Sequence, residues 1–115
     1  MTKVEFLTRN GFFAGMRATG HSGYSAAGSD IVCAAVSTAF GIVECAVNDV
    51  AKVHAPVASA KKNAALSVTV PEHITEEQRT ICDSAMRAAY LWLSENLREY
   101  GAFVRISTRE RSPKE

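Results

Sequence analysis

The sequence predicts an α+β fold in which two helices pack on one face of a single sheet of about four strands, mixed or antiparallel. Its 115 residues suit one domain, which we place at residues 1–115. Strand-like and helix-like segments follow one another in the order ββαβαβ, and no repeat or linker divides them. With 47% hydrophobic and 22% charged residues, the composition is typical of a globular protein and not of a disordered one.

The chain is expected to open with a β-hairpin. Two strand-like runs, VEFLTR and FFAGMRA, flank Asn10-Gly11. Asn-Gly favours a tight type I′ turn between strands because both residues accept a positive φ. Gly20 then frees the backbone at the end of the second strand, and a loop from Ser22 to Ser29 follows.

The first helix is expected to begin at Ser29 or Asp30, because either side chain can cap the first exposed N–H groups, and to run to about Val53. The proline in His54-Ala55-Pro56 closes it. The helix is apolar nearly all round, which predicts burial on more than one side, beneath the sheet and against a second helix or subunit. Polar residues such as Glu44 interrupt the apolar run and argue against a membrane span.

The rest of the chain supplies a strand, a helix and a last strand. ALSVTV, from Ala65 to Val70, follows a polar link. Thr75 and Gln78 have the spacing of a capping box that begins a helix to about Tyr100, with Gly101 as its C′ residue. AFVRIST completes the sheet, whose second face carries Thr, Arg and Ser and can meet water. One apolar stripe of the second helix has helical spacing: Cys82, Met86, Ala89, Leu93 and Leu97.

Charge and targeting signals give no reason to expect a nucleic-acid or membrane partner. The formal net charge of +1 produces no general attraction to polyanions. The N-terminal MTKVEFLTRN lacks the apolar core of a signal peptide. We therefore expect a cytoplasmic protein.

The three cysteines are expected to be free thiols that hold no metal. Their odd number and the absence of a CxxC motif argue against bridges in a cytoplasmic protein. Cys33 and Cys45 would lie about 18 Å apart along one helix, too far to share an ion. Cys82 falls on the apolar stripe and is expected in the core. No cofactor is expected.

The stretch GHSGYSAAGSDIVCAAVS, from Gly20 to Ser37, carries the candidate chemistry. Cysteine attacks as the thiolate, which needs stabilisation. If the helix begins at Ser29 or Asp30, Cys33 lies in its first turn, where free N–H groups and the helix dipole favour a negative charge and could also hold an oxyanion. His21 is the only histidine close to Cys33 in sequence and is the candidate base.

Neighbouring residues could support such a pair. Asp30 could orient His21 or hold the loop through backbone N–H groups, and Ser37 lies one helical turn after Cys33. Tyr24 could gate the cleft or contact substrate. On spacing alone, however, a single His and Cys separated by eleven residues more often accompany a buried, inert cysteine than a catalytic pair.

These residues resemble the signature of the ribosomal-processing cysteine proteases, the Prp family, in which G-H-A-G-Y and D-I-V-C-A-A-V-S flank a variable loop. This chain has GHSGY and SDIVCAAVS, with Ser22 in place of the usual alanine. The resemblance implies an endopeptidase with a Cys-His dyad, Cys33 and His21, that removes an N-terminal extension containing paired phenylalanines from a large-subunit ribosomal protein, the twenty-seventh. It also implies a homodimer, a loop that moves to admit substrate, and roles for Asp30 and Ser37.

Two other interpretations stay open. The domain could be a non-catalytic module that binds a ribosomal protein or the ribosome through its sheet face and loop, with Cys33 merely buried. It could also be a thiol redox sensor, although no resolving cysteine lies near Cys33 in sequence.

Overall fold

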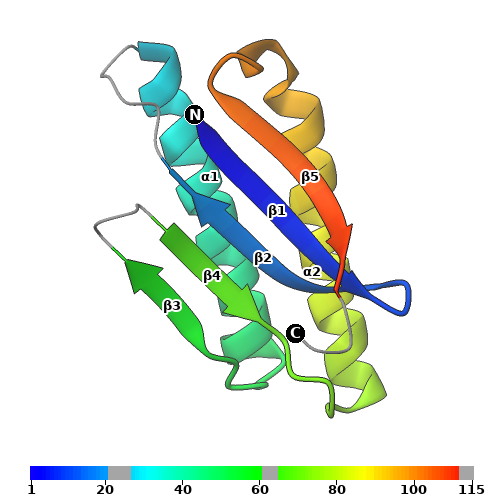
Figure 1. Ribbon diagram of the computed structural model, residues 1–115. Helices are drawn as coiled ribbons and strands as arrows, with labels where there is room; N and C mark the ends of the chain where they lie inside the picture. Colours follow the sequence, from blue (N-terminus) through cyan, green and yellow to red (C-terminus); the bar gives the residue numbers. More distant parts are fainter. Residues whose placement is uncertain (21–26, 61–64, 112–115) are drawn as a thin grey trace.

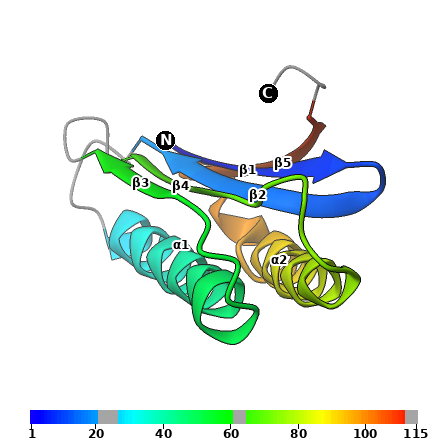
Figure 2. The ribbon, with the colours of Figure 1, turned by 90° about the horizontal axis from the view of Figure 1, so that it is seen from below.

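The computed structural model describes residues 1–20, 27–60 and 65–111. Within them, two helices cover one face of a mixed sheet of five strands (Figures 1 and 2). The predicted α+β class and the packing of both helices on one face are confirmed, whereas the sheet has five strands and not four. The elements are β1 (Thr2–Arg9), β2 (Phe12–Thr19), α1 (Ala27–Cys45), the π-helical turn η1 (Ala46–Val50), β3 (Val57–Ala60), β4 (Ala65–Thr69), α2 (Glu76–Asn96), the 3-10 turn η2 (Arg98–Tyr100) and β5 (Val104–Glu110).

The strands lie in the order β3-β4-β2-β1-β5. β1 and β5 are parallel, and the other three pairs are antiparallel. Asn10 and Gly11 have φ angles of 53° and 84°, so the turn predicted between β1 and β2 is confirmed. β1 lies between β2 and β5, and its alternate residues point either toward the helices or toward the opposite face of the sheet.

The strand that sequence patterning missed is β3. Its four residues, Val57–Ala60, are all exposed, and they carry neither an alternating apolar pattern nor an aromatic side chain. β3 exists because it pairs with β4 in antiparallel register, Val57 opposite Val68 and Ala60 opposite Ala65. Such long-range pairing cannot be read from four small residues.

The first helix begins earlier and ends slightly earlier than predicted. α1 starts at Ala27, so Ser29 and Asp30 are helical residues within its first turn and the predicted N-cap is wrong. At the other end the helix passes into η1 and stops at Val50. The Asn48 side chain closes this end, because its amide accepts from the Ala55 N–H at 2.6 Å and donates to the Ala55 carbonyl at 3.2 Å.

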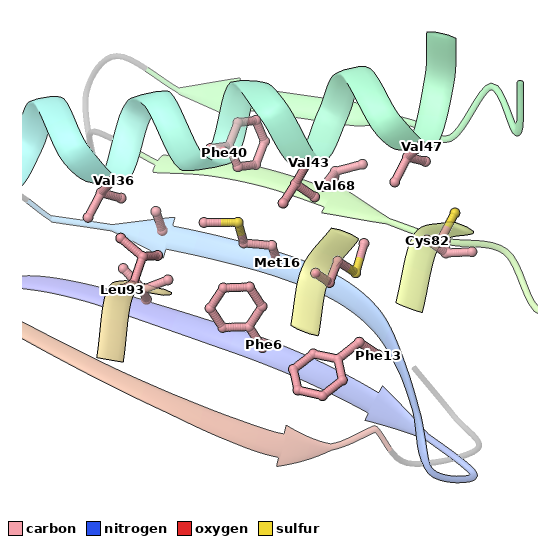
Figure 3. Packing of buried hydrophobic residues seen from close by; sticks show 14 of the residues in the cluster. Phe6, Phe13, Met16, Val36, Phe40, Val43, Val47, Val68, Cys82 and Leu93 are labelled. Carbon is pink, nitrogen blue, oxygen red and sulfur yellow. The ribbon is translucent and has the colours of Figure 1, made fainter. Parts of the chain in front are cut away.

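α1 contributes one side to the core and leaves another exposed. The Ile31–Val50 stretch is long and apolar enough to cross a membrane by length and composition alone. One side of this stretch packs against the sheet and α2, where Phe40 and Val43 lie against Met16 and Val68 (Figure 3). The outward side keeps Ile31 and Ile42 exposed, so the predicted burial on more than one side holds for the sheet and α2 only. The buried residues of the helix are Val32, Val36, Phe40, Val43 and Val47.

α2 has the predicted capping box and apolar stripe. The Thr75 hydroxyl accepts from the Gln78 N–H, and the Gln78 side chain accepts from the Thr75 N–H, both at 3.0 Å. Gly101 has a right-handed φ of −58° after η2, so its predicted role as a left-handed C′ residue is wrong. The stripe residues Cys82, Met86, Leu93 and Leu97 are buried, with Ala89 packed beside them.

Candidate active site

Cys33 lies on the wall of a hollow between α1 and one end of the sheet. The start of β1, the end of β2 and the start of α1 meet at this end of the molecule (Figure 1). The hollow has a volume of about 360 Å³. Cys33 is half-buried there, so its sulfur is placed on a cleft and not sealed inside the core. The hollow is lined by Thr2, Ala18, Gly20, Cys33, Val36, Ser37, Ser59, Ala60, Ala65 and Leu66.

The walls of this hollow are mostly small and apolar. Val36 and Leu66 face it from opposite elements, α1 and β4, and alanines from three strands fill the rest. Such a surface suits an apolar side chain of a bound peptide, because burial against it removes apolar area from water. Ser37 is exposed on the wall one turn after Cys33 and adds a hydroxyl to the same side.

Thr2 is a candidate functional residue that sequence reasoning missed. Its side chain is 4% exposed and lines the hollow, and its Oγ1 has no hydrogen-bond partner among the described residues. The Thr2 N–H donates to the Phe103 carbonyl at 2.9 Å, which fixes the backbone at this point. A buried hydroxyl without a partner costs free energy, so an uncompensated one beside a cleft points to a ligand group. A threonine in a strand gives no such signal in the sequence.

Gly20 directs the chain out of β2 toward residues 21–26. Its φ is +80°, a left-handed conformation that side chains disfavour. A Cβ at this position would lie 2.7 Å from the Met1 carbonyl oxygen. Both the positive φ and the short distance to the Met1 carbonyl favour glycine at this position. A larger residue would push residue 20 away from Met1, which directly precedes β1.

The structure brings together some of the predicted site residues. Cys33, Ser37 and Gly20 share the hollow. Asp30 lies in the first turn of α1. His21 and Tyr24 lie outside the described residues, so the pairing of His21 with Cys33 stays a prediction.

The other two histidines are placed away from Cys33. His54 follows η1, beyond Val50, and about 25 Å of helix separates Cys33 from Val50. His73 lines a different hollow beside the β1–β2 turn. Neither of these two described histidines lines the hollow that contains Cys33.

The early start of α1 changes the electrostatic argument for Cys33. Because the helix begins at Ala27, Cys33 is in its second turn, and the free N–H groups end roughly 6 Å before it along the axis. The helix dipole acts mainly within the first turn. The predicted placement of Cys33 in the first turn, on which the expected stabilisation of a thiolate and of an oxyanion by these N–H groups depended, is therefore wrong.

The other two thiols have different surroundings. All three cysteines are free. Cys45 is exposed, and its pKa is raised above the ordinary value first by a hydrogen bond with Asp49 and then by partial desolvation and the charges of Asp49 and Glu44. Cys82 is buried in the core as predicted, and burial raises the pKa of its thiol. Among the described residues, no group of three or more His, Cys, Asp or Glu side chains could hold a metal ion.

Comparisons with known proteins agree with this arrangement. A family model described as "Cysteine protease Prp" matches residues 1–105. The structure is similar to the ribosomal processing protease Prp from S. aureus in complex with a substrate peptide, with a TM-score of 0.76 and 16% identity over 95% of this chain and 100% of that one. It is also similar to SMU.848 from Streptococcus mutans, with a TM-score of 0.73 and 25% identity over 96% of both chains.

A third similar structure is the S. aureus Prp protease in complex with a covalently linked product peptide, with a TM-score of 0.72 and 19% identity over 95% of this chain and 100% of that one. No curated protein sequence matches this chain.

Proposed function

The chain belongs to the Prp family of cysteine proteases, and from this premise we propose that it removes the N-terminal extension of a large-subunit ribosomal protein, the twenty-seventh, with Cys33 as nucleophile and His21 as base. The observation that carries the proposal is the position of Cys33 on an apolar cleft at the end of the sheet, beside the residue that leads into His21. A cysteine buried for packing alone would be in the core, as Cys82 is.

The reaction needs only the thiol, the imidazole and water. His21 takes the proton of the Cys33 thiol, and the thiolate attacks the carbonyl carbon of the scissile peptide bond. The tetrahedral intermediate collapses as the C–N bond breaks, and the imidazolium gives its proton to the leaving amine. His21 then takes a proton from water, the resulting hydroxide attacks the Cys33 thioester, and the sulfur leaves and recovers the proton.

Other residues of the hollow bind and position the substrate. The apolar walls accept one of the paired phenylalanines of the extension, since an aromatic ring gains most from burial against Val36 and Leu66. The Thr2 hydroxyl, which has no partner among the described residues, hydrogen-bonds the bound peptide. Asp30 orients His21, and Tyr24 contacts the substrate from the loop.

The protein acts as a homodimer in the cytoplasm. Residues of α1 and α2 line an apolar groove of about 530 Å³. Figure 2 shows these two helices side by side on the same face of the sheet. Ile42 and Trp92 stand 64% and 54% exposed at this groove, between small alanines of both helices. A second copy would remove these side chains from water. Free thiols at Cys33 and Cys45 suit a reducing compartment.

The test is cleavage of a synthetic peptide that carries the ribosomal extension. The wild type should cut it, and Cys33→Ala and His21→Ala should each lose activity by at least about a hundredfold while keeping the wild-type circular dichroism spectrum. Cys45→Ala is the matched control, because it removes an exposed thiol from the far end of the same helix and should cut at the wild-type rate.

A Cys33→Ala variant that cuts as fast as the wild type would show that the nucleophile is wrong. No cleavage by any variant, with tight binding of the peptide, would favour the non-catalytic binding module.

A further inference from the structure

The face of the sheet opposite the helices, here called the open face, carries a concentration of basic side chains. No helix covers it (Figure 2). In β1, Val4 and Phe6 point into the core on the helix side, so the alternate residues Lys3 and Glu5 point to the open face. The register carries this alternation into the neighbouring strands. The basic residues that it places there are Lys3, Arg17, Arg105 and Arg109, and Arg111 joins them directly after β5.

The charge of the open face differs strongly from that of the whole protein. Among the described residues, five cationic side chains and one carboxylate, Glu5, give this face a formal charge of +4. The entire chain carries +1, so the rest of the sequence carries −3. Positive charge is therefore segregated onto one side, and the net charge conceals it.

These cations line two hollows that form one continuous surface. The larger one, about 470 Å³, includes Arg17, Arg109 and Arg111. The smaller one, about 240 Å³, includes Lys3, Arg17 and Arg105. Arg17 belongs to both, so the basic surface extends across the sheet from β5 to β2.

The single carboxylate on this surface neutralises only part of its charge. Glu5 Oε1 lies 3.3 Å from Arg109 Nε in an exposed ion pair, which contributes little to stability. In Arg111, Nε and Nη1 are buried and have no hydrogen-bond acceptor among the described residues. Among the described residues, the open face therefore carries more cationic side chains than carboxylates.

The side chains between the cations indicate which class of partner, nucleic acid or protein, this surface favours. Ser67, Thr69 and Ser107 lie between the basic residues, and no aromatic side chain is present among the described residues that line the two hollows. The core of a protein interface is typically aromatic and poor in charged residues, whereas this surface has five cations and no aromatic side chain among the described residues that line it, although Leu7, Met16 and Leu66 add apolar area to the larger hollow. Guanidinium groups beside hydroxyl side chains match phosphate, which they bind through paired N–H donors.

We propose that the open face binds the phosphodiester backbone of structured RNA without reading its sequence. The absence of aromatic side chains from the described lining leaves no platform for stacking bases, so contact is through phosphates. The choice of RNA over DNA rests on the proposed function, because a protease that acts on a ribosomal protein meets it beside ribosomal RNA. The net charge of +1 predicted no nucleic-acid partner because it does not show that basic side chains are concentrated on the open face.

The experiment measures binding of a fluorescein-labelled RNA hairpin by anisotropy between about 50 and 200 mM salt. With three to four phosphates neutralised, log K should fall against log salt with a slope of about −3. Arg17→Ser/Arg105→Ser should weaken binding about tenfold or more and reduce the slope by about 2. Lys52→Ser/Arg98→Ser is the matched control: it removes the same charge from residues outside the open face and should bind as the wild type does.

The outcomes separate this proposal from the protease activity. Arg17→Ser/Arg105→Ser should cut the short peptide at the wild-type rate, and Cys33→Ala should bind the hairpin with unchanged affinity. No salt-dependent binding by the wild type, an equal loss in the control variant, or equally tight binding of polyglutamate would overturn the proposal. Equal affinity for a DNA hairpin of the same sequence would overturn RNA as the occupant.

Discussion

Replacing Gly20 by alanine should destabilise the protein more than the same change at another left-handed glycine. Gly20 has a φ of +80°, and an added Cβ would lie 2.7 Å from the Met1 carbonyl oxygen. Gly11 has a φ of +84° with nothing within 4 Å of its Cβ position. A side chain at either position would be strained by the positive φ. Only at Gly20 would its Cβ also clash with a neighbouring carbonyl, that of Met1.

The magnitude follows from these two contributions. Alanine in the left-handed region costs about 1–2 kcal/mol, which is the whole expected effect of Gly11→Ala. At Gly20 the contact is with backbone, which cannot rotate away, and the forced shift adds about 1–3 kcal/mol. Gly41→Ala, in α1 with open space around its Cβ, should instead stabilise by about 0.5–1 kcal/mol.

Thermal unfolding followed by circular dichroism measures the series. At about 4 °C per kcal/mol, Gly20→Ala should lower Tm by about 8 °C or more, Gly11→Ala by about half as much, and Gly41→Ala should raise it. Assayed at 25 °C, Gly20→Ala should also lower kcat/KM for the ribosomal peptide, because this glycine directs the chain toward His21. Equal Tm values for Gly20→Ala and Gly11→Ala would refute the close approach to β1.

Three other changes test separate parts of the account. Thr2→Val should raise Tm by about 4 °C, because it removes an unpaired buried hydroxyl, and should lower kcat/KM; a fall in Tm would show that the hydroxyl has a partner in the free protein. Iodoacetamide at pH 7 should label Cys33 faster than Cys45 or Cys82, whose raised pKa values confine their reactivity to more alkaline pH; uniform labelling, read by mass spectrometry, would contradict an activated Cys33. Thr75→Ala should cost about 1 kcal/mol of unfolding free energy in urea and Thr75→Ser much less, whereas equal stabilities would argue against the cap.

Features set by neighbouring residues could be predicted from the sequence, and features set by distant pairing could not. The turn at Asn10-Gly11 and the capping box at Thr75 are determined within four residues, and both are present. β3 depends on β4 for its pairing and was missed. The start of α1 was placed late because Ser29 and Asp30 are good caps in isolation, yet they lie inside the helix.

The candidate site shows the same division. The motif places Cys33 and Ser37 one turn apart, and the structure brings both onto one hollow. Thr2 joins them from the start of β1, about thirty positions away in sequence, through a sheet register that no local pattern encodes. The basic open face is equally hidden, because it appears only when the alternation of three or more strands is known.

The identity of the nucleophile is tested most directly by trapping the covalent intermediate. The ribosomal peptide is mixed with an equal amount of the protein, the reaction is stopped in acid within a single turnover, and the modified residue is located by peptide-mapping mass spectrometry. Our account predicts the N-terminal product fragment joined as a thioester to Cys33. An acyl group on any other residue, or complete cleavage with no acylated Cys33 at any time, would contradict it.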